Sequence, residues 1–260
     1  MNSIINGVIS ENANIEDWKQ KGNAYEVLRV INNKPLFLKE HLLRLKSAVG
    51  NANILLIENE LKILIDSLEG DLNNNIFISV NTKTNATGIF IIKGFYPPKE
   101  WYENGIKINT CQIKRDDPSK KIYDINYKKK IEEHLKQTDV FEVLITDKGI
   151  INEGSRSNVF FIKGDVVLTP SVEAVLPGIT RDKVFEAAMN CGIKIIEMNI
   201  NTCDLKIFDG AFITGTSIDL LPIRQIDNFF FKTTDLECFK KLASNFENIK
   251  KKDLEIKNVK

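Results

Sequence analysis

The stretch Leu176-Pro-Gly-Ile-Thr-Arg-Asp182 decides the fold prediction. Its Pro-Gly pair predicts a tight turn, and apolar residues at helical spacing follow it as far as Gly192. We therefore expect a helix from about Thr180. The first amides of a helix have no partner within the helix, and the helix dipole places partial positive charge there. The stretch thus predicts a phosphate-binding helix start, with an ordinary threonine N-cap as the alternative.

Two other polar segments follow predicted strands. Thr214-Gly-Thr-Ser-Ile-Asp219 can present amides and hydroxyls to an anion, or it can be a plain polar turn between a strand and a helix. In Asn152-Glu-Gly-Ser-Arg-Ser-Asn-Val159, the carboxylate of Glu153 can pair with a protonated ring nitrogen or remain solvated. Both segments are therefore candidate parts of one ligand site.

A third candidate is Arg44, in the predicted helical segment Glu40-His-Leu-Leu-Arg-Leu45. A guanidinium group beside apolar positions can clamp a phosphate through two hydrogen bonds. It can equally form a surface ion pair, or lay its stem along apolar surface.

Composition excludes several classes of protein. Of the 260 residues, 43% are hydrophobic, which suffices for one large core or two modest ones. A net charge of +1 gives no support to a nucleic-acid partner. The four cysteines lack metal-site spacing and there are only two histidines, so we expect no metal and reduced thiols. With no long apolar run and no basic leader, we expect no membrane span and a cytoplasmic location.

The order of predicted elements indicates a mixed α/β chain in two lobes. The polar, proline-containing segment Lys114-Arg-Asp-Asp-Pro-Ser-Lys120 is the best linker candidate, which gives lobes of 1–113 and 121–260 around a linker of 114–120. Asn6-Gly7 predicts a type I′ hairpin turn. We further expect strands at 25–31, 36–38, 76–80, 89–93, 105–111, 142–146, 157–162, 166–169, 193–200 and 211–214. Helices are expected at about 39–49, 55–68, 127–137 and 180–191, and after the capping box Thr234-x-x-Glu237.

Together these segments resemble the class IV aminotransferases, which are pyridoxal-phosphate enzymes of fold type IV. That family includes branched-chain and D-amino-acid aminotransferases and aminodeoxychorismate lyase. The resemblance runs from about Tyr25 to Asp227. The matching segments are Tyr25-Glu-Val-Leu-Arg-Val, Phe37-Leu-Lys-Glu-His-Leu-Leu-Arg-Leu45, Glu153-Gly-x-x-Ser-Asn-Val-Phe, Leu176-Pro-Gly-Ile-Thr-Arg and Gly215-Thr-Ser.

The resemblance implies an α/β sandwich in the first lobe, a barrel-like second lobe, and a homodimer that binds pyridoxal phosphate. Arg44, Gly215, Thr216 and the amides of Ile179 and Thr180 would hold the phosphate. Glu153 would hold the pyridinium proton, Leu176 would pack on the ring, and Tyr127 would bond the phenolic oxygen. Tyr25 would border the substrate pocket, and Arg29 is a candidate for the substrate carboxylate, with a surface ion pair as the alternative.

The sequence departs from the family at the lysine that binds the cofactor covalently. That lysine lies three or four residues before an Asn, here Asn126, and the position falls on Tyr123. A tyrosine cannot form the bond. Lys121 lies two residues earlier and, on a strand, shares a face with Tyr123 at roughly 6.6 Å. It is therefore the candidate catalytic lysine, unless Lys120 and Lys121 are solvated linker charges.

Two functions follow. The first is pyridoxal-phosphate-dependent transamination of a small amino acid, or a lyase reaction on an aminodeoxychorismate-type substrate. The second is a catalytically degenerate relative that binds pyridoxal phosphate without a covalent bond, or binds another phosphorylated ligand.

Overall fold

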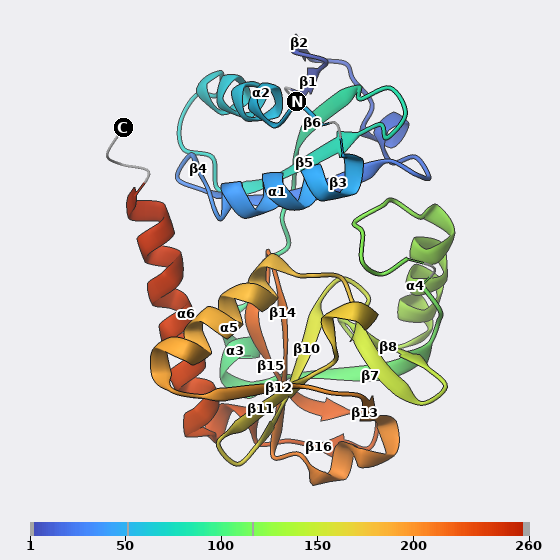
Figure 1. Ribbon diagram of the computed structural model, residues 1–260, viewed down its shortest axis with the longest axis vertical. Helices are drawn as coiled ribbons and strands as arrows, with labels where there is room; N and C mark the ends of the chain where they lie inside the picture. Colours follow the sequence, from blue (N-terminus) through green and yellow to red (C-terminus); the bar gives the residue numbers. More distant parts are fainter. Residues whose placement is uncertain (1–2, 51, 116, 257–260) are drawn as a thin grey trace. The chain divides into compact units, whose positions relative to one another are not determined.

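The computed structural model describes residues 3–50, 52–115 and 117–256, which fold into two compact units (Figure 1). The first unit contains Met1–Phe95, Lys120–Asn126 and Lys252–Lys260, and the second contains Tyr96–Ser119 and Tyr127–Lys251. These ranges differ from the expected lobes. Residues 106–112 pair with strands of the second unit, whereas Ile122 pairs with Ala24 of the first. Asp116, in the expected linker, lies outside the described residues.

The first unit is a six-stranded sheet of order β2-β1-β6-β5-β3-β4 with two helices. Its strands are β1 (Ser3–Ile5), β2 (Val8–Ser10), β3 (Ala24–Ile31), β4 (Lys34–Pro35), β5 (Asn74–Val80) and β6 (Thr87–Ile92); the helices are α1 (Leu38–Val49) and α2 (Ile54–Asp66), and a short 3-10 turn spans Ile15–Trp18. The expected hairpin turn is confirmed, because Asn6 and Gly7 have φ of 49° and 83°. Apolar side chains of both helices pack against the buried face of β3 and β5.

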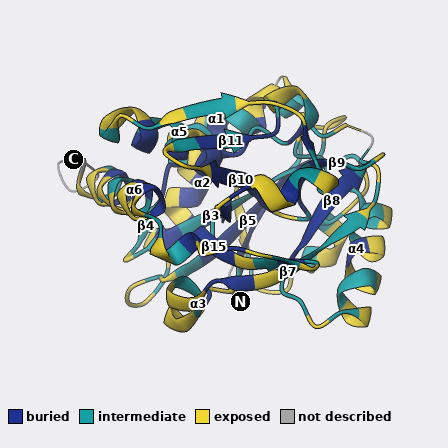
Figure 2. Cartoon of the chain, turned by 90° about the horizontal axis from the view of Figure 1, so that it is seen from below, coloured by how far each residue is buried: buried dark blue, intermediate teal, exposed yellow. Residues whose placement is uncertain are grey.

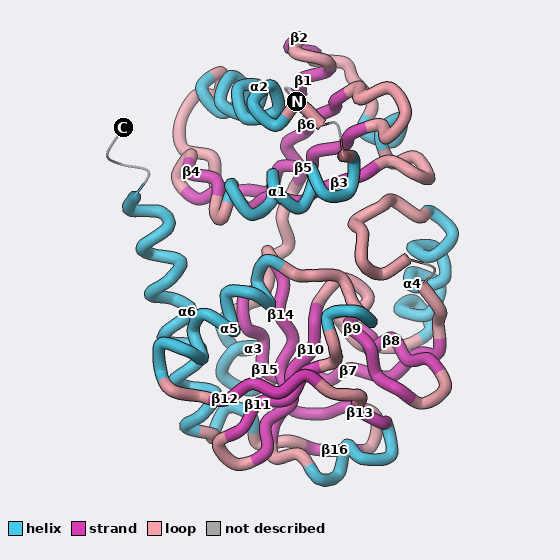
Figure 3. The backbone as a smooth tube through the Cα atoms, viewed as in Figure 1, coloured by secondary structure: helices cyan, strands magenta, loops and turns pink. Residues whose placement is uncertain are grey.

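The second unit is built on a ten-stranded sheet of mixed pairing. Its strands are β7 (Ile106–Gln112), β8 (Val143–Asp147), β9 (Ile150–Gly154), β10 (Asn158–Lys163), β11 (Val166–Thr169), β12 (Lys194–Glu197), β13 (Ile200–Asn201), β14 (Gly210–Gly215), β15 (Asp219–Ile226) and β16 (Phe229–Phe230). The helices are α3 (Lys99–Asn104), α4 (Ile125–Gln137), α5 (Ile179–Cys191) and α6 (Glu237–Ile256). Figure 3 shows its strands side by side, with α5 against β14.

Central strands of the second unit are buried on both faces. Figure 2 colours most of β8 and β10 as buried, and β10 carries Phe160 and Phe161, both 0% exposed. Phe160 stacks on Phe212 of β14, with ring centroids 5.0 Å apart, and Phe212 contacts Phe239 of α6. These contacts make the sheet a rigid support for the loops at its strand ends.

Several details of the fold differ from prediction, and helix α3 and strand β16 were not predicted at all. The segment 36–38 is not a strand, because Phe37 has a left-handed backbone conformation with φ of 52° and α1 begins at Leu38. The expected strand 193–200 is two short strands, which pair with β11 and β9 respectively. Strand β15 was not predicted, because Pro222 interrupts its apolar run. The capping box at Thr234 is wrong, because Thr233–Asp235 form a 3-10 turn and α6 begins only at Glu237.

Among the described residues, no helix combines the length and the apolar character that a membrane crossing requires.

A buried charge network joins β3 to α1 in the first unit. The Glu26 carboxylate accepts hydrogen bonds from Nε and Nη2 of Arg44, both at 2.7 Å, and lies 2.8 Å from Nδ1 of His41. Burial alone raises the pKa of Glu26, but the charge and hydrogen bonds of Arg44, together with His41, outweigh it and lower the pKa to about 2. Burial lowers the pKa of His41 more than Glu26 raises it. The network is therefore a carboxylate–guanidinium pair with a histidine beside it.

Replacing Glu26 with Gln should cost roughly 3 kcal/mol at pH 7, because the part-buried Arg44 guanidinium loses the negative charge of the buried carboxylate that it binds. Since the folded pKa of about 2 lies below the ordinary value of 4.5, the stabilisation by Glu26 is present above pH 4.5 and is lost as the pH falls towards 2. The difference in unfolding free energy between the wild type and Glu26→Gln, measured by denaturant titration, should shrink over that window. Glu58→Gln, an exposed control on α2, should change little. An equal difference at pH 7 and pH 2 would contradict the assignment.

Candidate functional site

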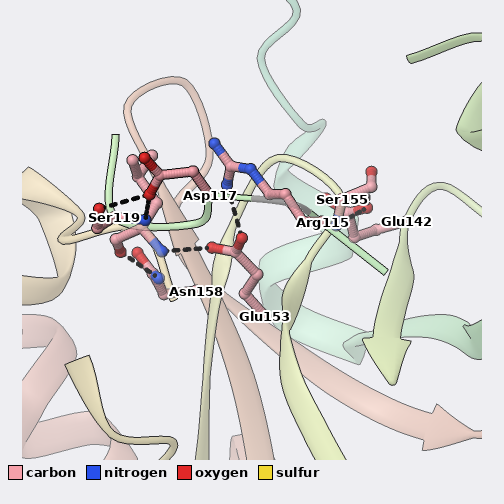
Figure 4. A network of polar contacts seen from close by, with 8 residues as sticks. Arg115, Asp117, Ser119, Glu142, Glu153, Ser155 and Asn158 are labelled. Carbon is pink, nitrogen blue, oxygen red and sulfur yellow. Dashed lines mark hydrogen bonds and ion pairs between the residues drawn. The ribbon is translucent and has the colours of Figure 1, made fainter. Parts of the chain in front are cut away.

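The predicted site carboxylate of the second unit is Glu153, near the end of β9. It is 5% exposed, its Oε1 accepts a hydrogen bond from Nη1 of Arg115 at 2.7 Å, and its Oε2 accepts one from the Leu176 amide at 2.9 Å. Figure 4 shows Glu153 with Arg115 on one side and Asn158 on the other. The positive charge of Arg115 and the amide dipole therefore fix both the charge balance and the orientation of this carboxylate.

Arg115 was not singled out from the sequence, because it lies in the polar stretch that was expected to be a linker. Its guanidinium carbon lies 5.9 Å from the ring centroid of Tyr127, at the start of α4. Two residues further along, Asp117 accepts hydrogen bonds from the amide and hydroxyl of Ser119 (Figure 4). Arg115 thus brings two predicted site residues, Glu153 and Tyr127, into one cluster.

Helix α5 begins as the sequence predicts, but with Gly178 rather than Thr180 as its N-cap. Gly178 has no side chain that could cap the first amides of the helix. Its φ of −75° is ordinary, and glycine is needed here for space, because a Cβ would overlap Oδ1 of Asn158. Asn158 in turn donates a hydrogen bond from Nδ2 to the Leu176 carbonyl at 2.9 Å. The helix start is therefore held against the β10 strand end.

The segment Thr216–Ile218 is the turn of the β14–β15 hairpin, not a strand-to-helix turn. Thr214 pairs with Asn158 across the sheet, so the strand end that leads into this turn lies next to the residue that holds Leu176. The Thr214 hydroxyl is buried and, within the part of the chain that the structure describes, has no hydrogen-bond partner. An uncapped helix start beside an unsatisfied hydroxyl is suited to bind an anion.

In the first unit, Tyr25, Lys121 and Tyr123 form a second cluster. The segment around Ile122 pairs with the start of β3, through hydrogen bonds from the Tyr25 amide to the Lys121 carbonyl at 3.0 Å and from the Tyr123 amide to the Asn23 carbonyl at 2.8 Å. Lys121 Nζ lies 4.9 Å from the Tyr25 ring centroid. The Tyr123 ring packs edge-on to the Tyr25 ring, with the two centroids 5.4 Å apart. As predicted for a strand, Lys121 and Tyr123 both reach the same side of β3.

Arg44 and Arg29 lie elsewhere in the first unit. Tyr25 and Glu26 are consecutive in β3 and point to opposite faces, so Arg44, bound to Glu26, is on the face away from the Tyr25 ring. Arg29 is half-buried on the Tyr25 side, four residues further along β3. The roles of both arginines, and of Tyr25, stay predictions.

Among the described residues, no three His, Cys, Asp or Glu side chains gather closely enough to hold a metal ion.

Comparison with known proteins agrees with these motifs. The family model for class IV aminotransferases matches residues 23–226. A putative branched-chain-amino-acid aminotransferase of Methanocaldococcus jannaschii is 29% identical over 252 residues, which cover 88% of this chain and 87% of that protein.

Solved structures share the fold. The crystal structure of a putative branched-chain amino acid aminotransferase from Thermotoga maritima superposes with a TM-score of 0.81 at 23% identity, covering 95% of this chain and 94% of that one. A hypothetical aminotransferase from Mycobacterium tuberculosis, in a PLP-bound form, has a TM-score of 0.80 at 14% identity, covering 97% and 100%. The architecture is thus that of the fold-type IV enzymes. Because the family model matches most of the sequence, the chain belongs to the class IV aminotransferase family.

Proposed function

We propose that the protein binds pyridoxal phosphate in its second unit and uses it to transfer the amino group of a small amino acid. The observation that carries this proposal is the Glu153 carboxylate held between Arg115 and the Leu176 amide. Family membership and the PLP-bound form of the Mycobacterium tuberculosis structure support it.

The residues of the second unit fit this cofactor. Glu153, oriented by two donors and balanced by Arg115, holds a proton at the pyridine nitrogen. The amides of Ile179 and Thr180 and the Thr216 hydroxyl bind the phosphate, because the helix start carries no side-chain cap. Arg44 is also assigned to the phosphate, on the family resemblance, and Gly215 keeps the end of β14 free of a side chain.

When bound, pyridoxal phosphate supplies a protonated ring that accepts electrons from the substrate's α-carbon. Leu176 packs on that ring, and Tyr127 hydrogen-bonds the phenolic oxygen. Lys121 is assigned to move the proton of the substrate's α-carbon. It is an amine on the Tyr25 side of β3, and it lies two residues before Tyr123, the position of the family lysine. Tyr25 borders the substrate, and Arg29 is assigned to the substrate carboxylate.

One observation favours a second function, namely cofactor binding without covalent chemistry. Tyr123 stands at the lysine position and is 6% exposed in an aromatic cluster with Phe77 and Phe90. Loss of the proton-transferring lysine costs on the order of 10²–10⁴-fold in rate unless Lys121 replaces it. The homodimer, the cytoplasmic location and an aminodeoxychorismate-type lyase reaction also remain proposals.

Titration with pyridoxal phosphate tests the cofactor site. We expect saturable binding to the wild type, and at least roughly tenfold weaker binding of pyridoxal, which lacks the phosphate and its charge-assisted hydrogen bonds. Glu153→Gln should weaken binding by roughly tenfold, since it removes the charge that faces the ring nitrogen. Glu132→Gln, an exposed control on α4, should leave binding unchanged. Equal affinity for both ligands would rule out the proposed phosphate site.

Borohydride reduction followed by peptide mass spectrometry separates the two functions. If Lys121 is the catalytic amine, the wild type should carry a reduced cofactor on Lys121, and Lys121→Ala should carry none. Tyr123→Lys should acquire a label at position 123, because its backbone is fixed by Asn23 as in the wild type. A wild type that retains the cofactor without any label contradicts the enzymatic function and supports the second one.

A further inference from the structure

A second carboxylate, Glu142, lies just before β8 and contacts the turn that follows Glu153. Glu142 is fully buried. Its Oε1 accepts hydrogen bonds from the amides of Val143 at 2.9 Å and Ser155 at 3.0 Å, and from the Ser155 hydroxyl. Its Oε2 accepts one from the Ser157 hydroxyl at 3.1 Å. Figure 4 shows Glu142 and Ser155 next to the Arg115–Glu153 pair.

These contacts make the conformation of the turn depend on Glu142. A buried carboxylate requires donors, and three of its four hydrogen bonds come from Ser155 and Ser157. Arg156, between them, places Nε 3.7 Å from Oε2 and its guanidinium carbon 4.7 Å from the Phe141 ring centroid. Gly154 is needed for space, because a Cβ there would overlap the Ser157 hydroxyl oxygen. The Glu142 carboxylate thus contacts three consecutive residues, 155–157.

The turn is connected to the cofactor site by two further hydrogen bonds. Asn158, the next residue, donates from Nδ2 to the Leu176 carbonyl, and the Leu176 amide donates to Oε2 of Glu153. The turn also closes on itself, with the Gly154 amide donating to the Ser157 carbonyl at 2.7 Å. Glu153 is therefore connected to the turn in two ways. Along the chain it is followed directly by Gly154, and through hydrogen bonds it is connected by way of Leu176 and Asn158.

We propose that Glu142 is a positioning residue, which orients Glu153 and the segment that leads into α5 without touching the cofactor. This inference rests on the proposed function, because it assigns Glu153 to the ring nitrogen and α5 to the phosphate. Glu142 couples the two ends of the cofactor site: it fixes the turn, the turn fixes Asn158, and Asn158 fixes Leu176.

The first test needs no cofactor and follows amide hydrogen exchange at single residues. In Glu142→Gln the amide group of Gln cannot accept all the hydrogen bonds that the carboxylate accepts. The exchange rate should rise roughly tenfold at the Ser155 amide. It should rise as much at the Leu176 amide, which is 34 residues from Glu142 and is connected to it through Asn158 and the turn. Amides of β15 should keep their wild-type rates. Acceleration confined to Ser155, or spread evenly over the second unit, overturns the proposal.

The second test is a double-mutant cycle on pyridoxal-phosphate affinity. Glu142→Gln should weaken binding roughly tenfold when Glu153 is present and by clearly less in a Glu153→Gln background, because the part of its effect that passes through that carboxylate is then already lost. An effect of stability alone would be equal in both backgrounds, and that result overturns the proposal. Ser155→Ala, which keeps Glu142 and removes one donor, gives the same comparison if Glu142→Gln does not fold. A wild type that binds no cofactor refutes the proposed function, whereas the exchange experiment still decides the role of Glu142.

Discussion

The site of the second unit depends on one constraint: a buried carboxylate must be surrounded by hydrogen-bond donors. Glu153 meets this constraint with Arg115 and the Leu176 amide. Because Leu176 directly precedes the Pro-Gly pair, the residue that orients the carboxylate also fixes where α5 begins. In the proposed function, a single backbone segment thereby sets the spacing between the residue assigned to the ring nitrogen and the amides assigned to the phosphate.

Glycine makes this arrangement possible through its size. Gly154 and Gly178 both have negative or unremarkable φ, yet each lies where a Cβ would meet a polar side-chain oxygen, of Ser157 and Asn158 respectively. These close approaches let side chains of the turn reach Glu142 and Leu176. The sequence shows the glycines, but their partners lie 3 and 20 residues away and become evident only in the folded chain.

The sequence predicted the parts of the site that are local and missed those that are distant. Helix α5 follows from apolar periodicity after a Pro-Gly turn, and most strands follow from β-rich runs between turn residues. Strand β15 was missed, because Pro222 opposes strand formation locally while its pairing with Phe212 favours it in the folded sheet. Arg115 was assigned to a linker, since nothing in a charged, proline-containing segment indicates that its guanidinium meets a carboxylate 38 residues later. The assignment of the family's lysine position to Tyr123 follows from the family resemblance and stays a prediction; the structure adds that the Tyr123 ring packs against Tyr25.

The most direct measurement is a crystal structure of the protein grown with pyridoxal phosphate. The ring nitrogen is expected within hydrogen-bond distance of Glu153, and the phosphate is expected to accept hydrogen bonds from the amides of Ile179 and Thr180. Cofactor density at any other place in the chain would contradict the proposed site.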